Sequence, residues 1–463
     1  MTYQDFIAAK THQGADHGFD PTWMPDILFP FQRALVEWEV RKGRAAIFAD
    51  CGLGKTFCQL TWAENVARKT GGRVLILTPL AVAFQTVNEG IKCGVEVEHR
   101  REGIEAGDRI VVTNYERLHH FNADDFAGVV CDESSILKNF EGATRAAVTD
   151  FMRKRPYRLL CTATAAPNDY VELGTSSEAI GDLGMRDMVT RFFKQDDGAR
   201  QGSRFAGPSD GRVDVGGFGK YRLRPHATHD FWRWVCSWAR AMRRPSDIGF
   251  DDGEFSLPPL NVRSHCVRAT TPRPGYLFDL PAVGLAEQRI DLRHTITERC
   301  EMAAALVNAH QMPACVWCNL IEEGHRLRKL IPDAVEVSGS DSEEFKEEAF
   351  QGFITGKIRV LVTKPTIAGF GLNFQHCAHA TYFPSHSYEQ YYQSVRRFWR
   401  FGQKLPVTVD MITTDGQEDV VRNLNRKTKQ ADEMFERLTA MMWREMRIER
   451  QNTMTQKARM PVW

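Results

Sequence analysis

The sequence predicts an α/β fold: two parallel-sheet lobes in tandem, an insertion between them and a helical tail. Two runs of short apolar segments support this fold class, because the segments of each run alternate with helical patterns. Parallel strands that are buried on both faces need such continuous apolar runs. The predicted strands are 45–48, 74–77, 110–113, 129–131 and 159–162 in the first lobe, and 314–317, 335–337, 359–362, 380–383 and 407–412 in the second.

Composition limits the broad class of the protein. The 463 residues exceed what one hydrophobic core supports, so about two to four domains are expected. The net charge of +1 gives no global attraction for nucleic acid, so any contact with a polyanion must come from local patches. The polar start has no signal-like apolar segment and no stretch reaches transmembrane length, so we expect a cytoplasmic protein without a membrane partner.

Eleven cysteines raise the question of disulfides or a metal site. Cys131, Cys161 and Cys315 lie in apolar strand-like runs, so we expect reduced, buried thiols. Cys315 and Cys318 form the only C-x-x-C, and no second pair stands at zinc-site spacing. We therefore interpret this pair as part of a buried strand.

The first lobe is assigned to 28–180, after an N-terminal segment at 1–27. It opens with a predicted helix over Gln32–Arg41, where Ala34, Leu35 and Trp38 recur at helical spacing. The strand at 45–48 then leads through a glycine-rich turn into a second helical pattern that continues to Ala67. This order of strand, loop and helix is typical of a phosphate-binding loop.

The glycine-rich turn has the sequence Ala49-Asp50-Cys51-Gly52-Leu53-Gly54-Lys55-Thr56. Its two glycines let the backbone fold closely around a polyphosphate, with amide N–H groups and the helix N-terminus facing the anion. Lys55 would then reach the β- and γ-phosphates, and the Thr56 hydroxyl would ligate Mg²⁺. The general pattern has glycine where this chain has Ala49, so an ordinary strand-to-helix turn with an incidental lysine stays open as the alternative.

Two adjacent acids, Asp132 and Glu133, follow the predicted strand at 129–131. In a phosphate-loop enzyme the first acid holds Mg²⁺, and the second orients and deprotonates the attacking water. The alternative is a pair of solvated loop acids. Together with the glycine-rich turn, the pair predicts ATP and Mg²⁺ as cofactors.

The alternation of strands and helices stops between Gly181 and Leu292, which we assign as an insertion at 181–292. Glycine, proline and charged residues predict a long loop over Gln195–Lys220. Phe231–Trp238 is a helix candidate that carries three tryptophans. We expect these rings to pack into a small core, and a stacking surface for nucleic acid is the alternative.

A second alternation, 293–416, begins with a predicted helix over Glu298–Ala309 and forms the second lobe. The last region, 417–463, holds a charged helix over Val420–Arg450 and a basic tail. We expect this helix to cover part of the second lobe, and an arm that binds nucleic acid is the alternative.

Further motifs follow in a characteristic order: Phe31-Gln32, Thr78-Pro79, Thr113-Asn114-Tyr115-Glu116, 162–168, 369–373 and 393–403. The last resembles Gln-x-x-x-Arg-x-x-Arg-x-Gly-Gln and is the most specific. Over about 28–412 the chain resembles superfamily 2 helicases, and within them the Swi/Snf-type DNA translocases. The departures are Ala163 and Ala165 for glycine and proline, and Arg396 where that group usually has an acid.

The resemblance implies two RecA-like lobes that enclose ATP, with matching residues in named roles. Glu133, Arg397 and Arg400 would be catalytic, the arginines as fingers on the γ-phosphate. Thr56 and Asp132 would hold Mg²⁺. The nucleotide-binding set would be Gln32, Gly52, Leu53, Gly54, Lys55, Thr56, Gly371 and Gln393. Contacts with nucleic acid and coupling would fall to Thr78, Thr113, Thr162, Thr164, Gly369 and Asn373.

The predicted function is ATP-driven translocation along DNA by a monomeric protein of phage or bacterial origin. Duplex DNA is the favoured partner and RNA stays open, because the expected contacts are to the backbone. A strand-separating or branch-migrating helicase is one alternative, and a DNA-binding scaffold switched by ATP is another. The insertion or the tail would be the surface for a protein partner. Cys51 is expected to fill space in the loop, with an oxidation-sensitive thiol as the alternative.

Overall fold

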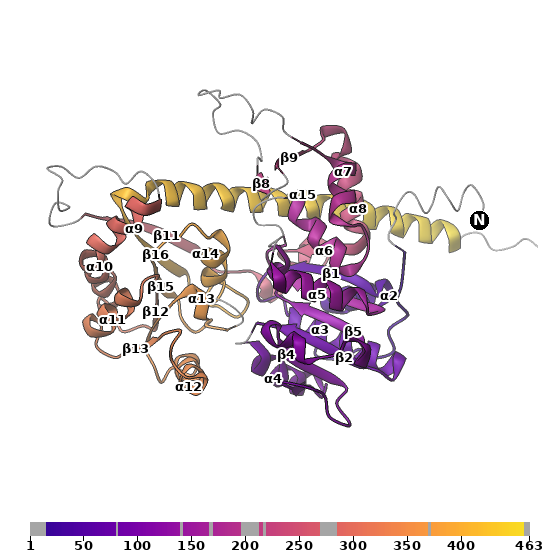
Figure 1. The fold of residues 1–463 in the computed structure, drawn as a ribbon, viewed down its shortest axis with the longest axis horizontal. Helices are drawn as coiled ribbons and strands as arrows, with labels where there is room; N and C mark the ends of the chain where they lie inside the picture. The colour runs from indigo at the N-terminus through magenta and orange to yellow at the C-terminus, as the bar shows by residue number, and fades with distance from the viewer. Residues whose placement is uncertain are drawn as a thin grey trace, which may run out of the picture. The chain divides into compact units, whose positions relative to one another are not determined.

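The computed structural model describes residues 15–79, 82–138, 142–165, 170–195, 213–215, 219–268, 285–368 and 372–457. The chain forms two compact units, which can be followed in Figure 1. Unit 1 is Met1–Asp252 with Gln430–Trp463, and unit 2 is Gly253–Lys429. Each unit holds a parallel sheet, and a long helix closes the chain, so the predicted fold class is confirmed.

Unit 1 is built on a seven-stranded parallel sheet in the order β10-β1-β6-β5-β2-β4-β3. All five strands predicted for the first lobe lie within it, because their apolar side chains are buried on both faces. The strands are β1 (Arg44–Ala49), β2 (Arg73–Thr78), β3 (Glu98–His99), β4 (Ile110–Asn114), β5 (Phe126–Asp132), β6 (Tyr157–Thr162) and β10 (Ala239–Met242).

The helices of unit 1 cover this sheet. Helix α3 crosses the centre, where a Cβ on Gly128 of β5 would lie 3.1 Å from Cγ1 of Val66 on α3. That close approach packs the C-terminal half of α3 closely against β5. The helices are α2 (Pro30–Lys42), α3 (Lys55–Thr70), α4 (Ala83–Cys93), α5 (Ala143–Arg153), α6 (Leu173–Ile180), α7 (Met185–Phe192) and α8 (Thr228–Trp238).

Helix α8 carries the predicted tryptophan cluster. Trp232, Trp234 and Trp238 are at most 4% exposed, and they pack against one another or against Phe231 of the same helix. Their packing role is therefore confirmed. Nearby, β7 (Phe193–Gln195), β9 (Gly219–Leu223) and β8 (Val213–Val215) form a small antiparallel sheet in the order β7-β9-β8.

Between Gly181 and Leu292, where we expected the alternation of strands and helices to stop, the chain adds one strand to each of the two parallel sheets, and these two strands were not predicted. Strand β10 pairs with β1, and β11 (Leu260–Val267) pairs with β16 at the edge of the second sheet. β10 has only four residues and follows α8 directly, so it has no separate apolar signal. β11 is mostly exposed and alternates polar side chains such as Asn261, Arg263 and His265, because an edge strand needs fewer apolar residues.

Unit 2 is built on a six-stranded parallel sheet in the order β11-β16-β15-β12-β14-β13. Its other strands are β12 (Ala314–Trp317), β13 (Ala334–Val337), β14 (Val360–Thr363), β15 (His379–Tyr382) and β16 (Val407–Thr414), which match the five predicted strands within a residue or two. Its helices are α9 (Leu285–His294), α10 (Ile296–Asn308), α11 (Ile321–Leu330), α12 (Glu343–Ile354), α13 (Pro365–Ala368) and α14 (Tyr388–Val395).

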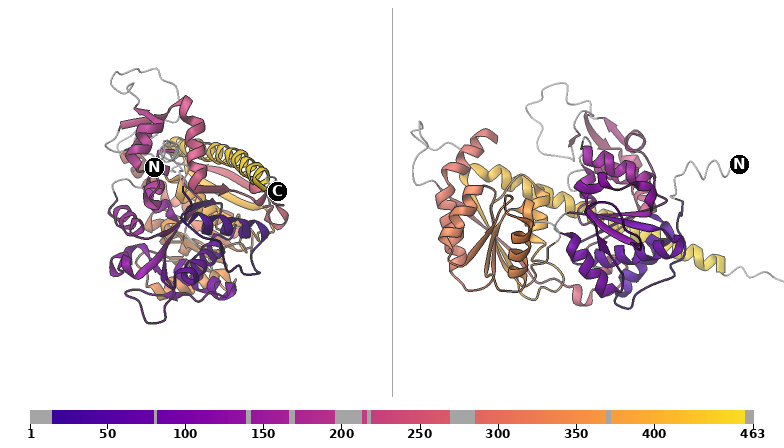
Figure 2. Two further views of the ribbon diagram at one scale, coloured as in Figure 1. Left: turned by 90° about the vertical axis from the view of Figure 1, so that its right-hand side faces the viewer. Right: turned by 60° about the horizontal axis from the view of Figure 1, so that its bottom comes forward.

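Helices lie on both sides of this second sheet, as the right-hand view of Figure 2 shows. Side chains alternate along β12: Cys315 and Trp317 join one core cluster, and Val316 and Cys318 join the other. Both cysteines of the C-x-x-C are thus buried and free, as expected. Among the described residues no cluster of histidine, cysteine or acidic side chains fits a metal ion.

Helix α15 (Glu418–Lys457) begins in unit 2 and passes into unit 1 at Gln430. Beyond that point it packs on unit 1: Arg243 forms an ion pair with Asp432 at 2.8 Å and lies 4.6 Å from the ring centre of Phe435. The expected placement over the second lobe therefore holds only for the first part of the helix. The periodicity of a helix shows which face is apolar, not which sheet that face covers.

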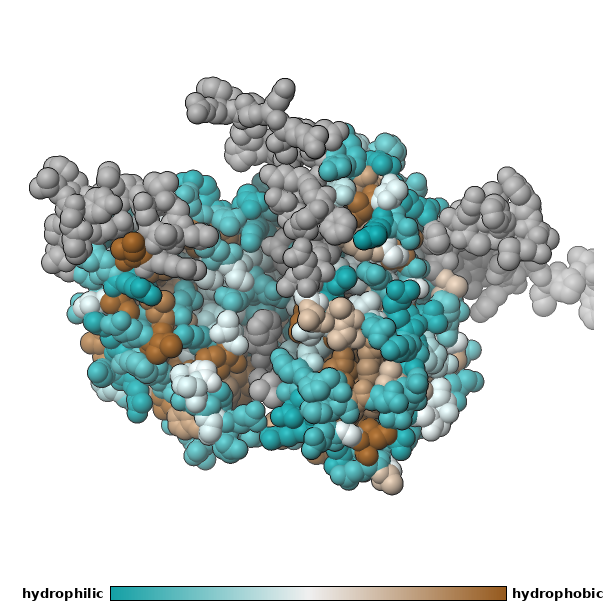
Figure 3. Space-filling view, in the orientation of Figure 1, coloured by the Kyte–Doolittle hydropathy of each residue, from teal (hydrophilic) through white to brown (hydrophobic). Residues whose placement is uncertain are grey.

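The visible face in Figure 3 is mostly hydrophilic, with scattered apolar patches. Exposed apolar side chains include Ile91, Ile321 and Leu405, each more than half exposed. In the described part of the chain, no helix has the length and apolar character to cross a membrane.

Candidate active site

The glycine-rich turn joins β1 to α3 as predicted. Gly52 and Gly54 have φ of 88° and 74°, in the left-handed region that favours glycine. A Cβ on Gly54 would lie 2.2 Å from Nε2 of Gln32, so a larger residue there would be strained and would displace the Gln32 side chain. Within the described residues, the N–H groups from Gly52 to Thr56 have no hydrogen-bond partner. Five unpaired N–H groups at a helix start suit a polyphosphate.

Lys55 lies along this turn. Its Nζ donates to the carbonyl oxygens of Ala49 at 2.8 Å and Asp50 at 3.2 Å. No carboxylate forms an ion pair with Lys55 among the residues that are described, so phosphate oxygens can replace these two carbonyls without breaking an ion pair. The Asp50 N–H donates to Met242 O at 2.9 Å, which ties the turn to β10.

Gln32 is buried at 3% exposure and holds the turn from α2. Its Nε2 donates to Leu53 O at 3.0 Å, and its Oε1 accepts from Phe29 N–H at 2.9 Å. The structure thus places Gln32 against the glycine-rich turn, where it holds the Leu53 backbone.

Asp132 and Glu133 stand at the carboxyl end of β5, in the same region as the turn. Gln59 of α3 donates from Nε2 to Asp132 Oδ1 at 2.7 Å. Burial and the charge of Glu133 raise the pKa of Asp132 to about 6, while the Gln59 hydrogen bond and the Lys55 charge oppose the rise. The pair is therefore buried beside a cation and is not a pair of solvated loop acids.

Glu133 is linked to the end of β6, which lies between β1 and β5 in the sheet. Thr162 Oγ1 donates to Glu133 Oε2 at 3.5 Å, and it accepts from Thr164 N–H at 3.0 Å. Both threonines are at most 4% exposed. The structure therefore brings Thr162 and Thr164 together with Glu133, as parts of one hydrogen-bonded chain.

The residues around the turn fit a magnesium nucleotide. Mg²⁺ takes oxygen ligands and is held by one or two protein oxygens together with phosphates and water. The Thr56 hydroxyl and the Asp132 carboxylate, on neighbouring segments, would be ligands of this kind. The unpaired N–H groups and Lys55 fit the phosphates. Cys51 of the same turn is buried, at 8% exposure.

Thr78 and Thr113 lie at the ends of β2 and β4, which pair with each other in register. Both are 0% exposed, and neither hydroxyl has a hydrogen-bond partner among the described residues. Asn114 Oδ1 and Ser134 Oγ, next in sequence to Thr113 and Glu133, are also buried and have no hydrogen-bond partner among the described residues. Several buried polar groups without hydrogen-bond partners therefore lie at the same end of the sheet as the two acids, below the protein surface.

Unit 2 carries the predicted arginines just after α14. Arg397 is 2% exposed: Nε and Nη2 donate to Gln393 O and Oε1 at 3.1 and 2.7 Å, and Nη1 donates to Leu372 O at 2.9 Å. Its own carbonyl accepts from Phe374 N–H at 3.0 Å. Arg397, which Gln393 holds in place, therefore contacts the backbone on either side of Asn373. Gly369 and Gly371 lie outside the described residues.

Arg396 and Arg400 flank this arginine. Arg396 is 3% exposed, and its guanidinium carbon lies 4.7 Å from the Trp399 ring centre. Burial, together with the charges of Arg400 and Arg397, lowers the pKa of Arg396 to about 9. Arg400 is half-buried. Of the three arginines, Arg400 is thus the one with appreciable solvent exposure.

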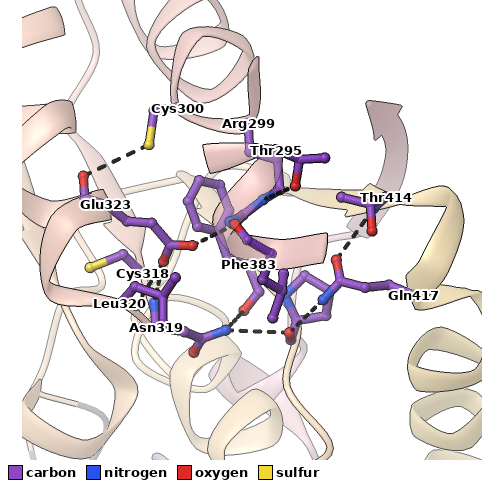
Figure 4. Close-up of polar contacts among 12 residues, drawn as sticks. Thr295, Arg299, Cys300, Cys318, Asn319, Leu320, Glu323, Phe383, Thr414 and Gln417 are labelled. Atoms are coloured by element: carbon purple, nitrogen blue, oxygen red, sulfur yellow. Dashed lines mark hydrogen bonds and ion pairs between the residues drawn. The ribbon is translucent and has the colours of Figure 1, made fainter. Parts of the chain in front are cut away.

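A buried network ties the carboxyl ends of the unit 2 strands together, as Figure 4 shows. Arg299 of α10 and Glu323 of α11, each 1% exposed in their side chains, form an ion pair at 2.5 Å. Glu323 Oε2 accepts from the N–H groups of Asn319 and Leu320, both at 2.8 Å. Asn319 Nδ2 in turn donates to Phe383 O at 2.9 Å. The network fixes the segments after β12 and β15.

Sequence reasoning assigned no role to two residues that contact Asp132. Gln59 bonds Asp132, and the Tyr115 hydroxyl donates to Asp132 O at 2.5 Å. A partial signal exists for Gln59, since it stands four residues after Lys55 and therefore shares its helix face. Nothing in the pattern around Tyr115 indicates that its ring reaches β5.

Neither the protein-family models nor the curated proteins searched match this sequence. Among solved structures, the chain is similar to the Sulfolobus solfataricus SWI2/SNF2 ATPase core in complex with dsDNA. The identity is 14%, the match covers 86% of this chain and 90% of that chain, and the TM-score is 0.42. Because this similarity is weak, the function of this chain has to be inferred from its own residues.

Proposed function

We propose that this chain is an Mg²⁺-dependent ATPase that uses hydrolysis to move along nucleic acid, with duplex DNA as the favoured track. One observation carries the ATPase assignment: Lys55, Asp132 and Glu133 gather at the ends of β1 and β5 around a turn with unpaired N–H groups. A structural turn would need neither a lysine bound only to carbonyls nor two buried acids.

Each residue of the site has a defined task in hydrolysis. The N–H groups of Gly52–Thr56 and the Lys55 ammonium bind the phosphates. Thr56 and Asp132 would hold Mg²⁺, which supplies positive charge to the phosphate oxygens when bound. Glu133 orients the attacking water and accepts its proton. Gln32 fixes the Leu53 backbone, so that the loop is shaped before ATP arrives.

The arginines of unit 2 complete the proposed catalytic set. An additional cation stabilises the charge that spreads over the γ-phosphoryl oxygens in the transition state. Arg400 is assigned this task, because Arg397 is committed to Gln393 and Leu372. A cation from a second unit makes hydrolysis depend on the conformation of the protein, and such dependence is what a motor needs.

Nucleic-acid contacts are assigned to the segment around Asn373, through sequence-independent groups. Four threonines of unit 1 are buried, so we assign them to coupling ATP hydrolysis to movement and not to direct contact with nucleic acid: Thr78, Thr113, Thr162 and Thr164. A near-neutral net charge is compatible with such local contacts.

The test is the steady-state ATPase rate with single-stranded DNA, duplex DNA, forked DNA and RNA at one fixed salt concentration, since phosphate contacts make affinity strongly dependent on salt. Stimulation by duplex DNA without strand separation supports translocation. Release of a strand from forked DNA supports a helicase instead. Binding of DNA with less than one turnover per bound molecule supports an ATP-switched scaffold and contradicts the motor.

A further inference from the structure

The two acids of the site stand on an unusual backbone turn. Glu133 has φ of 49°, and among the described residues Asp333 is the only other non-glycine residue with a positive φ. A side chain other than glycine in this region costs free energy, so such a conformation persists only where neighbouring contacts enforce it. The question is which contacts enforce it at Glu133.

Resting on the proposed function, we propose that Tyr115 and Gln59 are positioning residues that hold the Asp132–Glu133 turn in its productive geometry. Neither residue belongs to the acidic motif or to the glycine-rich turn. Both are buried, Tyr115 at 4% exposure and Gln59 at 0%. They reach the turn from two different elements.

Tyr115 fixes the backbone of the turn. It follows β4 directly, at the start of a short 3₁₀ segment (Tyr115–His120), and its hydroxyl donates to Asp132 O at 2.5 Å. That carbonyl is part of the peptide group between Asp132 and Glu133. The hydrogen bond therefore restrains the orientation of this peptide plane, and with it the direction of the Glu133 side chain. A phenol hydroxyl carries its proton at neutral pH, so Tyr115 can serve as the donor of this hydrogen bond.

Gln59 fixes the Asp132 side chain. Its Nε2 donates to Asp132 Oδ1 at 2.7 Å, and only this orientation of the amide places a donor toward a carboxylate. Its own Oε1 is buried without a partner among the described residues. A buried acceptor left unpaired is unfavourable, which indicates that Gln59 is present for the carboxylate and not for stability.

The two contacts divide the work between the acids. Gln59 sets the orientation of the carboxylate that would hold Mg²⁺, and Tyr115 sets the backbone that aims Glu133. The groups assigned to the phosphates, Lys55 and the unpaired N–H groups, do not depend on either contact. Loss of Tyr115 or Gln59 should therefore lower kcat and leave ATP binding intact.

The experiment compares Tyr115→Phe and Gln59→Leu with the unchanged protein. Each variant removes one hydrogen bond and keeps the bulk of the side chain. We expect kcat to fall about 5- to 30-fold in each, as for the loss of one buried hydrogen bond in the transition state. The KM for ATP, and the affinity for a fluorescent ATP analogue measured without turnover, should change less than about twofold.

Tyr382→Phe is the matched control, because it removes an equally buried hydroxyl from β15 of unit 2. We expect its kcat to stay within about twofold of the unchanged protein, whatever its effect on the unfolding temperature. If Gln59→Leu does not fold, Tyr115→Phe alone decides.

The outcomes separate this proposal from the assignment on which it rests. An active unchanged protein whose kcat survives both substitutions overturns the positioning role. A fall in analogue affinity with kcat unchanged at saturation also overturns it. If the unchanged protein does not hydrolyse ATP at all, the ATPase assignment itself fails, and the positioning role fails with it.

Discussion

Lys55 of unit 1 and Arg397 of unit 2 are both cations predicted to meet phosphate, and the structure treats them differently. Lys55 donates hydrogen bonds to two carbonyl oxygens of its own loop. Arg397, in contrast, is only 2% exposed, and all three of its guanidinium nitrogens donate hydrogen bonds within unit 2. A cation held by two loop carbonyls exchanges them for a ligand at little cost, but a buried arginine with several bonds does not. The comparison teaches that a motif match gives the residue type, while the contacts decide whether the residue is available.

The largest expected effect concerns the unit 1 site. Glu133→Gln keeps the size of the side chain and removes its basicity, so kcat should fall by about 10²- to 10⁴-fold. Lys55→Ala should lower kcat and ATP affinity together. A phosphate-release assay measures the rates, and circular dichroism checks that the fold is retained. Undiminished turnover in either variant would contradict the site.

The next effect separates the two arginines of unit 2. Arg400→Ala should lower kcat by about 10³-fold or more, with ATP affinity and the unfolding temperature nearly unchanged. Arg397→Ala should lower the free energy of unfolding by about 2–4 kcal/mol, because Leu372 O and Gln393 Oε1 lose a charged donor. Urea unfolding monitored by fluorescence measures the second effect. Equal stability of the two variants would remove the distinction between them.

A buried ion pair gives unit 2 a stability test away from the arginine motif. Glu323→Ala leaves Arg299 buried without its carboxylate, so the free energy of unfolding should fall by about 3–5 kcal/mol. Glu322→Ala is the control, since Glu322 is exposed and pairs with Arg326 on the helix surface. If both variants lose the same stability, the Arg299–Glu323 network does not hold the strand ends.

The smallest effect concerns Glu39, a buried acid of unit 1 that the site does not use. It is 0% exposed, both carboxylate oxygens lack a partner among the described residues, and burial raises its pKa well above the usual value. Above the unfolded pKa of about 4.3, the native state binds the proton more tightly, so stability falls as pH rises until the native group ionises. Glu39→Met should remove this slope and raise stability near neutral pH by about 1–3 kcal/mol.

Thermal unfolding of both proteins between pH 4 and pH 8 checks the Glu39 prediction. Gln417 is a suitable control position, because this buried side chain has hydrogen-bond partners in Pro384 O and Thr414 N–H. Gln417→Met should destabilise the protein at every pH. A pH slope that survives Glu39→Met would contradict the account of this carboxyl.

The sheets and the first site could be predicted because their signals are local. Strands such as β2 are continuous apolar runs. The turn at Gly52–Thr56 has glycines with positive φ followed by a lysine, a pattern that few kinds of site require. The same logic identified Asp132 and Glu133 at a strand end. Edge strand β11 was not predicted, because it is mostly exposed and polar and so has no continuous apolar run.

The tertiary contacts could not be predicted, because they join residues far apart in sequence. Gln59 and Asp132 are 73 positions apart, and Arg397 and Leu372 are 25 apart. A glutamine within a helix and an arginine within a motif look the same whether they bind a neighbour or a ligand. The packing of α15 on unit 1 was missed for the same reason, since no local pattern names the surface that a helix covers.

The most direct test of the central claim is the steady-state release of phosphate from ATP, with and without duplex DNA, by the unchanged protein beside Glu133→Gln. We predict multiple turnovers per protein molecule that require Mg²⁺, rise with duplex DNA and disappear in Glu133→Gln. Phosphate release that is equal in both proteins, or absent from the unchanged protein under every condition, would contradict the assignment of Lys55, Asp132 and Glu133 to an ATPase site.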